Sequence, residues 1–374
     1  MEVRKNHIAL DLFVFIAIVF IAFVLQEIMV PVLFALLLSV LLYPIVQFLE
    51  RKLRFNRIFS ALTAILISFI VAMAVFTFIG IQLKEIISKS GEYMDSIEAK
   101  MLPLIKDAEE TTGLNSEEIV EPDSLKMEKV VKDNFSNITD FIFASGSMLG
   151  KLILVPLYMF FFLLYRKFFI SFIYTLVEKK CTKEETKAIL HKLYDVQQNY
   201  FVGLITVMLL VGILNSVGLL ALGIDYPYFF GFLCALLLLI PYIGIIIGSL
   251  LPALVALATK DSYWYALGVI GIFGVIQFIE GNLITPKITG SKVSINAFVS
   301  ILSIVVFAML WGTSGMVLAL PITASLKVLF DHSPHFTAYG FLLGEPTEEY
   351  LKSRARRRLK IWKAIRKGRK KVIR

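Results

Sequence analysis

Four polar side chains that could bind a cation or a small solute lie close together in the chain: Gln277, Glu280, Asn282 and Thr285. Apolar runs long enough to enter a bilayer flank them on both sides. An ionisable group at such a depth is tolerated only beside a partner or in a water-filled cavity, which makes it a candidate functional group. The carboxylate could exchange a proton or coordinate a cation, while the amides and the hydroxyl could hydrogen-bond a polar solute. The alternative is that Glu280 ends a helix at the level of the lipid headgroups.

Proline and glycine are expected to break the apolar helices that position these groups. Pro241 and Pro252 bound one glycine-containing apolar segment, and the run from Val293 to Phe330 is too long for a single crossing. Broken helices expose backbone polar groups, which a membrane tolerates only where they are buried in protein or line a cavity. Short segments interrupted in this way are the best sequence indication of a transporter's binding site.

The residues expected to shape these breaks form one set. Four glycines, at 244, 248, 281 and 290, would allow close approach of the backbone, and Pro286 would fix the break after Glu280. The full set of expected hinge and broken-helix residues is Pro241, Gly244, Gly248, Pro252, Gly281, Pro286, Gly290, Gly312, Gly315 and Pro321.

The composition places the chain in a membrane. Hydrophobic residues make up 57% of its 374 residues and the mean hydropathy is +0.78, whereas globular domains contain roughly 45–50% apolar residues. The sequence contains no phosphate-binding loop, zinc-protease motif, nucleophile elbow or dinucleotide fingerprint. Its two cysteines give no disulfide framework. We therefore expect an all-α polytopic membrane protein that is not an enzyme, with no metal and no cofactor.

Positive charge is concentrated at the C-terminus. Residues Lys352 to Arg374 contain 13 Lys and Arg and no acidic residue. The formal net charge of the whole chain is +9, so the rest of the chain has a net charge of −4. Each basic residue near an anionic leaflet contributes about 1 kcal/mol to membrane binding. We expect this tail to bind anionic lipids. RNA binding is the less favoured alternative, and no nucleic-acid partner is expected.

The hydropathy pattern predicts about eight hydrophobic segments, some of them broken or re-entrant. Four positive charges lie between residues 51 and 57, so the positive-inside rule places this loop and both termini in the cytoplasm. Residues 84–140 hold 14 Asp and Glu against 7 Lys, and one further crossing places this acidic segment outside. The lysine-rich stretch 166–198 is typical of a cytoplasmic amphipathic segment.

These boundaries divide the chain into four expected parts. Residues 1–83 form N-terminal transmembrane helices, and residues 84–140 form an acidic helical segment outside the cytoplasm. Residues 141–330 form the transmembrane transport region, which includes the amphipathic segment. Residues 331–374 form the basic cytoplasmic tail.

Several motifs resemble, in order, the signatures of one family of membrane transporters. They are Ile240-Pro-Tyr-Ile-Gly, Ile279-Glu-Gly-Asn, Pro286-Lys-Ile-Thr-Gly-Ser-Lys and Gly312-Thr-Ser-Gly-Met-Val-Leu-Ala-Leu-Pro321. The sequence is similar to the AI-2E (autoinducer-2 exporter, PerM-like) family. That resemblance implies a secondary transporter or exporter in the bacterial inner membrane, assembled as a homo-oligomer. The chain departs from the family after the Ser-Lys motif, where members commonly carry a proline and this chain has Ile295-Asn296-Ala297.

The resemblance leaves the transported species open. It implies export of an autoinducer-2-like signal, as in quorum sensing, with Na⁺/H⁺ antiport as the alternative within the same family. Glu280 would be the titratable or cation-coordinating group, and Asn282, Gln277 and Thr285 would supply hydrogen bonds. A passive channel would share the broken helices, and a membrane scaffold would move no solute at all.

Overall fold

The computed structural model describes residues 8–100, 146–178, 181–239, 243–288 and 295–346, and the regular structure in these ranges is entirely helical. This confirms the predicted all-α class. Pro241, Gly290, most of the acidic segment and the tail from Lys352 lie outside the described residues. In chain order the elements are α1 (Ile8–Val24), α2 (Gln26–Arg51), α3 (Arg57–Ser88), α7 (Gly146–Leu164), α8 (Arg166–Val177), α9 (Lys183–Ala221), α10 (Pro227–Leu237), α11 (Ile243–Thr259), α12 (Trp264–Ile279), η1 (Glu280–Ile284), α13 (Thr285–Ile288), α14 (Ala297–Asp331) and α15 (Thr337–Leu343).

The described helices include several that could cross a membrane. By length and composition five qualify, namely α2, α3, α9, α14 and the continuous stretch Trp264–Ile284. A sixth span is formed if the pair Leu154–Leu164 and Arg166–Val177, which meet at a 70° bend, is counted as one. Two shorter apolar helices, in α10 and α11, are also present. The protein is therefore a multi-pass membrane protein, as the hydropathy pattern predicts, and its bent pair is either a broken span or a re-entrant loop.

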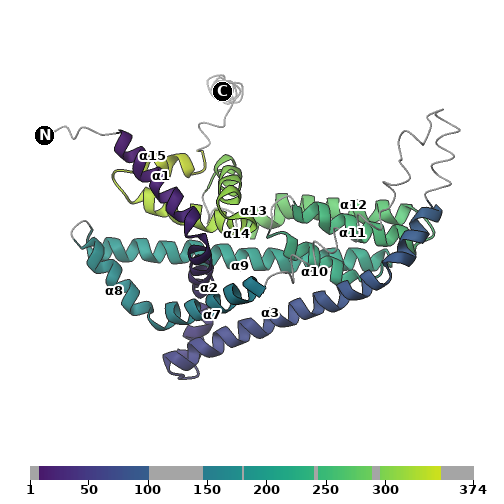
Figure 1. The fold of residues 1–374 in the computed structure, drawn as a ribbon, viewed down its shortest axis with the longest axis horizontal. Helices are drawn as coiled ribbons and strands as arrows, with labels where there is room; N and C mark the ends of the chain where they lie inside the picture. The colour runs from purple at the N-terminus through teal and green to yellow at the C-terminus, as the bar shows by residue number, and fades with distance from the viewer. Residues whose placement is uncertain (1–7, 101–145, 179–180, 240–242, 289–294, 347–374) are drawn as a thin grey trace, which may run out of the picture.

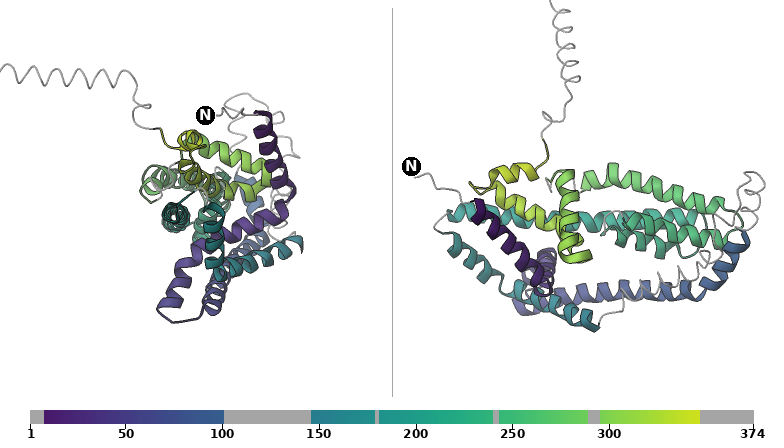
Figure 2. Two further views of the ribbon diagram at one scale, coloured as in Figure 1. Left: turned by 90° about the vertical axis from the view of Figure 1, so that its left-hand side faces the viewer. Right: turned by 45° about the horizontal axis from the view of Figure 1, so that its top comes forward.

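Helix α9 is the rod against which much of the molecule packs (Figures 1 and 2). Its 39 residues give a length of about 58 Å, well beyond the ~30 Å core of a bilayer. The helix begins at a capping box, in which the Thr182 hydroxyl accepts from the Glu185 N–H and the Glu185 carboxylate accepts from the Thr182 N–H. The stretch 166–198 is consequently divided between α8 and the first part of α9, which continues without a break into the span.

Helices α10 and α12 pack along the second half of α9, while α11 packs against α10 and α12. Glycines bring α9, α10 and α11 close together. A Cβ at Gly231 of α10 would overlap the Ser216 hydroxyl of α9, and a Cβ at Gly244 of α11 would overlap the carbonyl oxygen of Leu237. At Gly248 the added carbon would lie 2.6 Å from the sulfur of Cys234. The glycines therefore let α10 and α11 form a tight hairpin, of which α10 lies directly on α9.

Helix α14 is interrupted where the sequence predicts it. Trp311 and Gly312 have non-helical backbone angles, and Gly312 has φ +63° and ψ −143°. Val299 and Ala324, from opposite sides of the break, belong to one buried cluster. At 1.5 Å per residue the first half, 297–310, is about 21 Å long, which is too short to cross the bilayer core alone.

Local contacts fix both the start and the break of α14. The Asn296 side chain accepts from the Val299 N–H at 2.9 Å, so asparagine caps the start of the helix. The Trp311 indole donates to the carbonyl oxygen of Ala22 in α1 at 3.0 Å. A Cβ at Gly315 would overlap the carbonyl oxygen of Phe307. The interrupted helix is thus held by specific packing.

Substituting Gly312→Ala should destabilise the protein by about 1–3 kcal/mol, because this combination of φ and ψ is nearly exclusive to glycine. The cost is conformational, since an added Cβ would meet no atom of the described residues within 4 Å. The thermal unfolding midpoint of the purified protein in detergent measures the effect. Gly80→Ala in α3 is the matched control, because its Cβ also has open space and its φ is not in the positive range. Equal midpoints for the two variants would contradict the argument.

Candidate functional site

The predicted binding residues lie where α12 widens into a π-helical turn. Residues Glu280–Ile284 form η1, and the N–H of Thr285 donates to the carbonyl oxygen of Glu280 five residues earlier. Such π-turns are rare and occur frequently at functional sites. The wider turn places Thr285 on the same side of the helix as Glu280. Gln277 lies about one turn before Glu280.

The carboxylate of Glu280 accepts a hydrogen bond on each oxygen. The Gln277 side-chain amide donates to Oε2 at 2.7 Å, and the Thr285 hydroxyl donates to Oε1 in a short contact. All three side chains are partly buried. Each carboxylate oxygen keeps a further lone pair for a proton, a cation or a solute hydroxyl.

Asn282 does not join this group. Its side-chain amide donates to the carbonyl oxygen of Phe278 at 2.9 Å, and the residue is exposed. The structure therefore brings three of the four predicted binding residues together and leaves the fourth on another side of η1.

The site is packed on α9 beside the tip of the α10–α11 hairpin. Val207 and Val211 of α9 and Ile276 of α12 form a buried cluster. The partly buried side chains around it come from the end of α10, from α12, from η1 and from α13: Leu238, Ile272, Ile284 and Ile288. The end of α10 at Leu238 thus packs in the cluster that contains Ile276 and Ile284, which lie four residues before and four residues after Glu280.

The expected roles of the prolines and glycines differ from position to position. A Cβ added at Gly281 would have no described atom within 4 Å. The expectation that this glycine allows close approach of the backbone therefore does not hold in this structure. Pro252 lies inside α11 and Pro321 inside α14, and neither ends its helix. Pro286 lies in α13 directly after η1. A proline can remain inside a membrane helix where neighbouring groups satisfy the carbonyl that it frees.

The break in α14 packs on the same helix as the Glu280 site. Phe201 of α9 packs against the cluster that contains Trp311 and Leu318, and Val207 lies six residues further along α9. Six residues correspond to about 9 Å along the helix axis. The break in α14 and the Glu280 site therefore pack against neighbouring parts of α9.

Gln197 is a buried polar residue that the sequence analysis missed. It is 4% exposed, and its amide donates to the carbonyl oxygen of Pro321 at 2.8 Å and to the hydroxyl of Ser325 at 2.7 Å. These bonds join α9 to the second half of α14. The sequence feature that could have indicated it is the polar run Gln197-Gln198-Asn199, which directly precedes the apolar part of α9.

Replacing Gln197 by leucine should weaken the contact between α9 and α14. Hydrogen bonds between membrane helices contribute about 0.6 kcal/mol on average and about 1.7 kcal/mol at most, so we expect a loss of about 1 kcal/mol in the free energy of unfolding. A double-mutant cycle with Ser325→Ala measures the coupling directly. Thr206→Val on the exposed side of α9 is the control. A coupling energy near zero would show that the contact does not hold the two helices.

A second polar contact fastens the bend between α7 and α8. Arg166 Nη2 lies 2.5 Å from Glu50 Oε2 of α2, and each side chain is 17% exposed. The guanidinium also lies over the ring of Tyr43, 5.3 Å from its centre. The contact joins the start of α8 to α2, and removing either partner would leave a shielded charge unpaired.

Comparison with known proteins gives one consistent family. The model of the AI-2E family transporters matches residues 12–335. YrrI of Bacillus subtilis, provisionally named a transport protein, is 32% identical over 153 residues, which cover 41% of this chain and 43% of YrrI. A Haemophilus influenzae protein with the same provisional name is 26% identical over 333 residues, which cover 85% of this chain and 90% of that one. The AI-2 transport protein TqsA of Escherichia coli is 23% identical over 325 residues, which cover 86% of this chain and 91% of TqsA.

Proposed function

The chain belongs to the AI-2E family of transporters, and on that basis we propose that it is a secondary transporter that moves a small polar solute across the bacterial inner membrane by alternating access. Family membership makes it a multi-pass membrane transporter with a small-molecule substrate and not an enzyme. The binding residues, the mode of movement and the identity of the solute are parts of the same proposal.

The observation that carries the proposal is the carboxylate of Glu280 at the π-helical turn. It is held by Gln277 and Thr285, beside the tip of the α10–α11 hairpin. A carboxylate that keeps free lone pairs next to a hydroxyl and an amide can accept a proton or bind a hydroxylated solute. Glu280, Gln277 and Thr285 are the proposed binding residues, and Asn282 would take part only after leaving the Phe278 carbonyl.

The interrupted elements provide the proposed movement. The α10–α11 hairpin and the two halves of α14 would move against α9, which is long and continuous. Glycine contacts at Gly244, Gly248 and Gly315 leave no room for side chains, so these elements can slide as packed backbones. Hinge and shear movements of this kind are common in proteins that close around ligands.

Two solutes fit the donor set. The relative TqsA is named as an AI-2 transport protein, and the hydroxyl groups of an autoinducer-2-like molecule could donate to the Glu280 carboxylate and to the Thr285 hydroxyl oxygen. Alternatively, the carboxylate, hydroxyl and amide oxygens are hard ligands of the type that bind small cations, which supports Na⁺/H⁺ antiport. Autoinducer-2 export is the first candidate because a relative matched over most of the chain carries that name.

The proposed membrane orientation is based on charge. With the loop at residues 51–57 inside, both termini lie in the cytoplasm, and the basic residues from Lys352 lie where they can bind anionic lipids. Residues 84–140 then lie outside, residues 141–330 form the transport region, and residues 331–374 form the cytoplasmic tail. Assembly as a homo-oligomer is part of the same proposal.

Purified protein in liposomes tests the proposed transport. Autoinducer-2 flux and Na⁺-dependent proton movement would be measured with and without an imposed proton gradient, against protein-free liposomes. Flux that an imposed gradient drives uphill supports a secondary transporter. Flux that only tracks the solute gradient would indicate a passive channel, and no flux of either species would favour a scaffold.

A further inference from the structure

Helix α3 extends far beyond what a membrane crossing requires. Its 32 residues correspond to about 48 Å against a bilayer core of ~30 Å, and residues 90–100 continue in helical conformation. In Figures 1 and 2 this helix runs the length of the molecule, from the α2 end to the end where α10, α11 and α12 lie. We call residues 79–100 the α3 extension.

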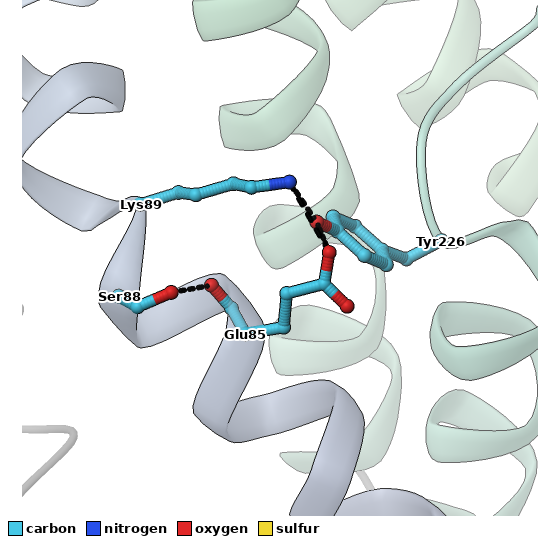
Figure 3. Close-up of polar contacts among 4 residues, drawn as sticks. All are labelled: Glu85, Ser88, Lys89 and Tyr226. Carbon is cyan, nitrogen blue, oxygen red and sulfur yellow. Dashed lines mark hydrogen bonds and ion pairs between the residues drawn. The ribbon is translucent and has the colours of Figure 1, made fainter.

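The α3 extension meets the start of the α10–α11 hairpin at Tyr226 (Figure 3). The Tyr226 hydroxyl donates to Glu85 Oε1 at 2.8 Å and accepts from Lys89 Nζ at 2.8 Å. Lys89 also lies 3.2 Å from Glu85 Oε1, and its ammonium lies 5.5 Å from the centre of the Tyr226 ring. Hydrogen bonds with Tyr226 and then Glu85 raise the pKa of Lys89, so the ammonium form is the one that makes these contacts.

The backbone of Tyr226 is strained. It lies in the left-handed region, with φ 55° and ψ 42°, immediately before α10. Non-glycine residues adopt this conformation uncommonly, and it persists where the surroundings over-determine it. The contacts to Glu85 and Lys89 are among the surroundings that hold it, and their release would allow the strain to relax.

The same extension fastens the other end of the hairpin. Lys100 Nζ donates to three backbone carbonyls at the end of α11, those of Leu257 at 3.0 Å, Ala258 at 2.9 Å and Lys260 at 2.8 Å. The last carbonyls of a helix have no partner within the helix and favour a cation. A single lysine thus satisfies several of them and ties α11 to α3.

Apolar packing fills the space between these two polar contacts. Ile79, Leu83 and Ile86 of α3 share a buried cluster with Phe229 and Phe230 of α10 and with residues of α11 and α12. The α3 extension therefore contacts both outer ends of the hairpin, while the inner tip at Leu238 lies in the cluster beside η1. Because α11 packs closely on α10 at Gly244 and Gly248, we expect movement of the outer ends to shift the inner end beside η1 as well.

We propose that the α3 extension is a latch on the α10–α11 hairpin: Glu85, Lys89 and Lys100 hold the hairpin in place over the Glu280 site, and Tyr226 leaves Glu85 and Lys89 when the site opens. These are positioning residues, because none of them touches the Glu280 group. The inference rests on the proposed transport cycle. Glu85 and Lys89 are 46% and 44% exposed, so water can replace their contacts readily, and the relaxation of Tyr226 favours release. The latch is therefore reversible.

Covalent closure of the latch tests the movement. In a Cys181→Ser, Cys234→Ala background, Lys89→Cys and Tyr226→Cys would be joined by a bis-maleimide that contains a disulfide, and the protein would be placed in liposomes. We expect at least a tenfold loss of flux when the two are linked and recovery when reductant cleaves the linker. The matched control links Glu85→Cys to Lys89→Cys within α3, which removes similar groups but leaves the hairpin free, and it should retain the flux of its unlinked form. Unchanged flux in the linked Lys89–Tyr226 variant would overturn the proposal.

A distance measurement tests the latch without any transported solute. Spin labels on Glu92→Cys in the α3 extension and Asp261→Cys at the α11–α12 turn report the separation of the two elements, and both positions are exposed. Tyr226→Phe removes only the hydroxyl, so we expect it to increase the population of the longer distance several-fold. An unchanged distance distribution would overturn the latch. A shifted distribution in a protein that moves neither autoinducer-2 nor Na⁺ would retain the latch and refute the proposed transport.

Discussion

Substituting Glu280→Gln should lower coupled transport by about 10- to 100-fold and remove its dependence on the proton gradient. The neutral amide keeps the size of the side chain but cannot bind a proton or balance a cation. Hydrogen bonds to a charged group contribute about 1.5–3 kcal/mol, and each 1.4 kcal/mol changes an equilibrium constant tenfold. The Thr285 hydroxyl can rotate to accept from the new amide, so the π-helical turn should persist. Flux in liposomes at several pH values is the measurement.

Asp261→Asn is the matched control for this loss of charge. Asp261 is exposed at the α11–α12 turn, and its variant should transport like the parent at every pH. Thr285→Val should have an intermediate effect, because it removes one of the two donors and keeps the carboxylate. If Glu280→Gln transports like the parent across the pH range, the carboxylate is not the coupling group. Reduced flux that keeps its full pH dependence would assign Glu280 to solute binding alone.

The features predicted from the sequence are those that local chemistry determines. A long apolar run interrupted by Trp311-Gly312 must bend where glycine alone can adopt the required angles, and α14 does so. A polar stretch after an apolar one predicts a site near the end of α12, and Glu280 lies there with Gln277 and Thr285. The start of α9 was not predicted, although it also has a local cause, because Thr182 followed three residues later by Glu185 is a capping-box signature.

The features that sequence reasoning missed depend on contacts between distant segments. The spacing of five between Glu280 and Thr285 brings them together only in a π-turn, and no local preference distinguishes that turn from an α-helix. Gln197 is one polar residue among several in α9 until α14 supplies the Pro321 carbonyl. Similarly, Lys100 is an ordinary lysine of an acidic segment until the end of α11 lies against it. Such pairings require the packing of whole helices to be known.

The glycines show most clearly that one residue type can be required at different positions for different physical reasons. Gly244→Ala should destabilise the protein by about 3 kcal/mol, the upper end of the range for overpacking, and should abolish transport. Its Cβ would overlap the Leu237 carbonyl group, which is backbone and cannot rotate away. The end of α10 and the start of α11 would have to separate, which opens the hairpin beside the Glu280 site. The thermal midpoint in detergent and flux in liposomes measure the two effects.

Gly281→Ala is the matched control, because the same methyl group is added in open space. Alanine favours helical conformation over glycine by about 1 kcal/mol, so this variant should be as stable as the parent or slightly more stable. The comparison separates close packing from backbone freedom, since neither glycine has a positive φ. If both variants lose stability equally, the close contact with Leu237 is not the reason for the glycine at 244. If only Gly281→Ala loses transport while remaining stable, the turn at Glu280 must change shape during the cycle, and glycine is required there for movement.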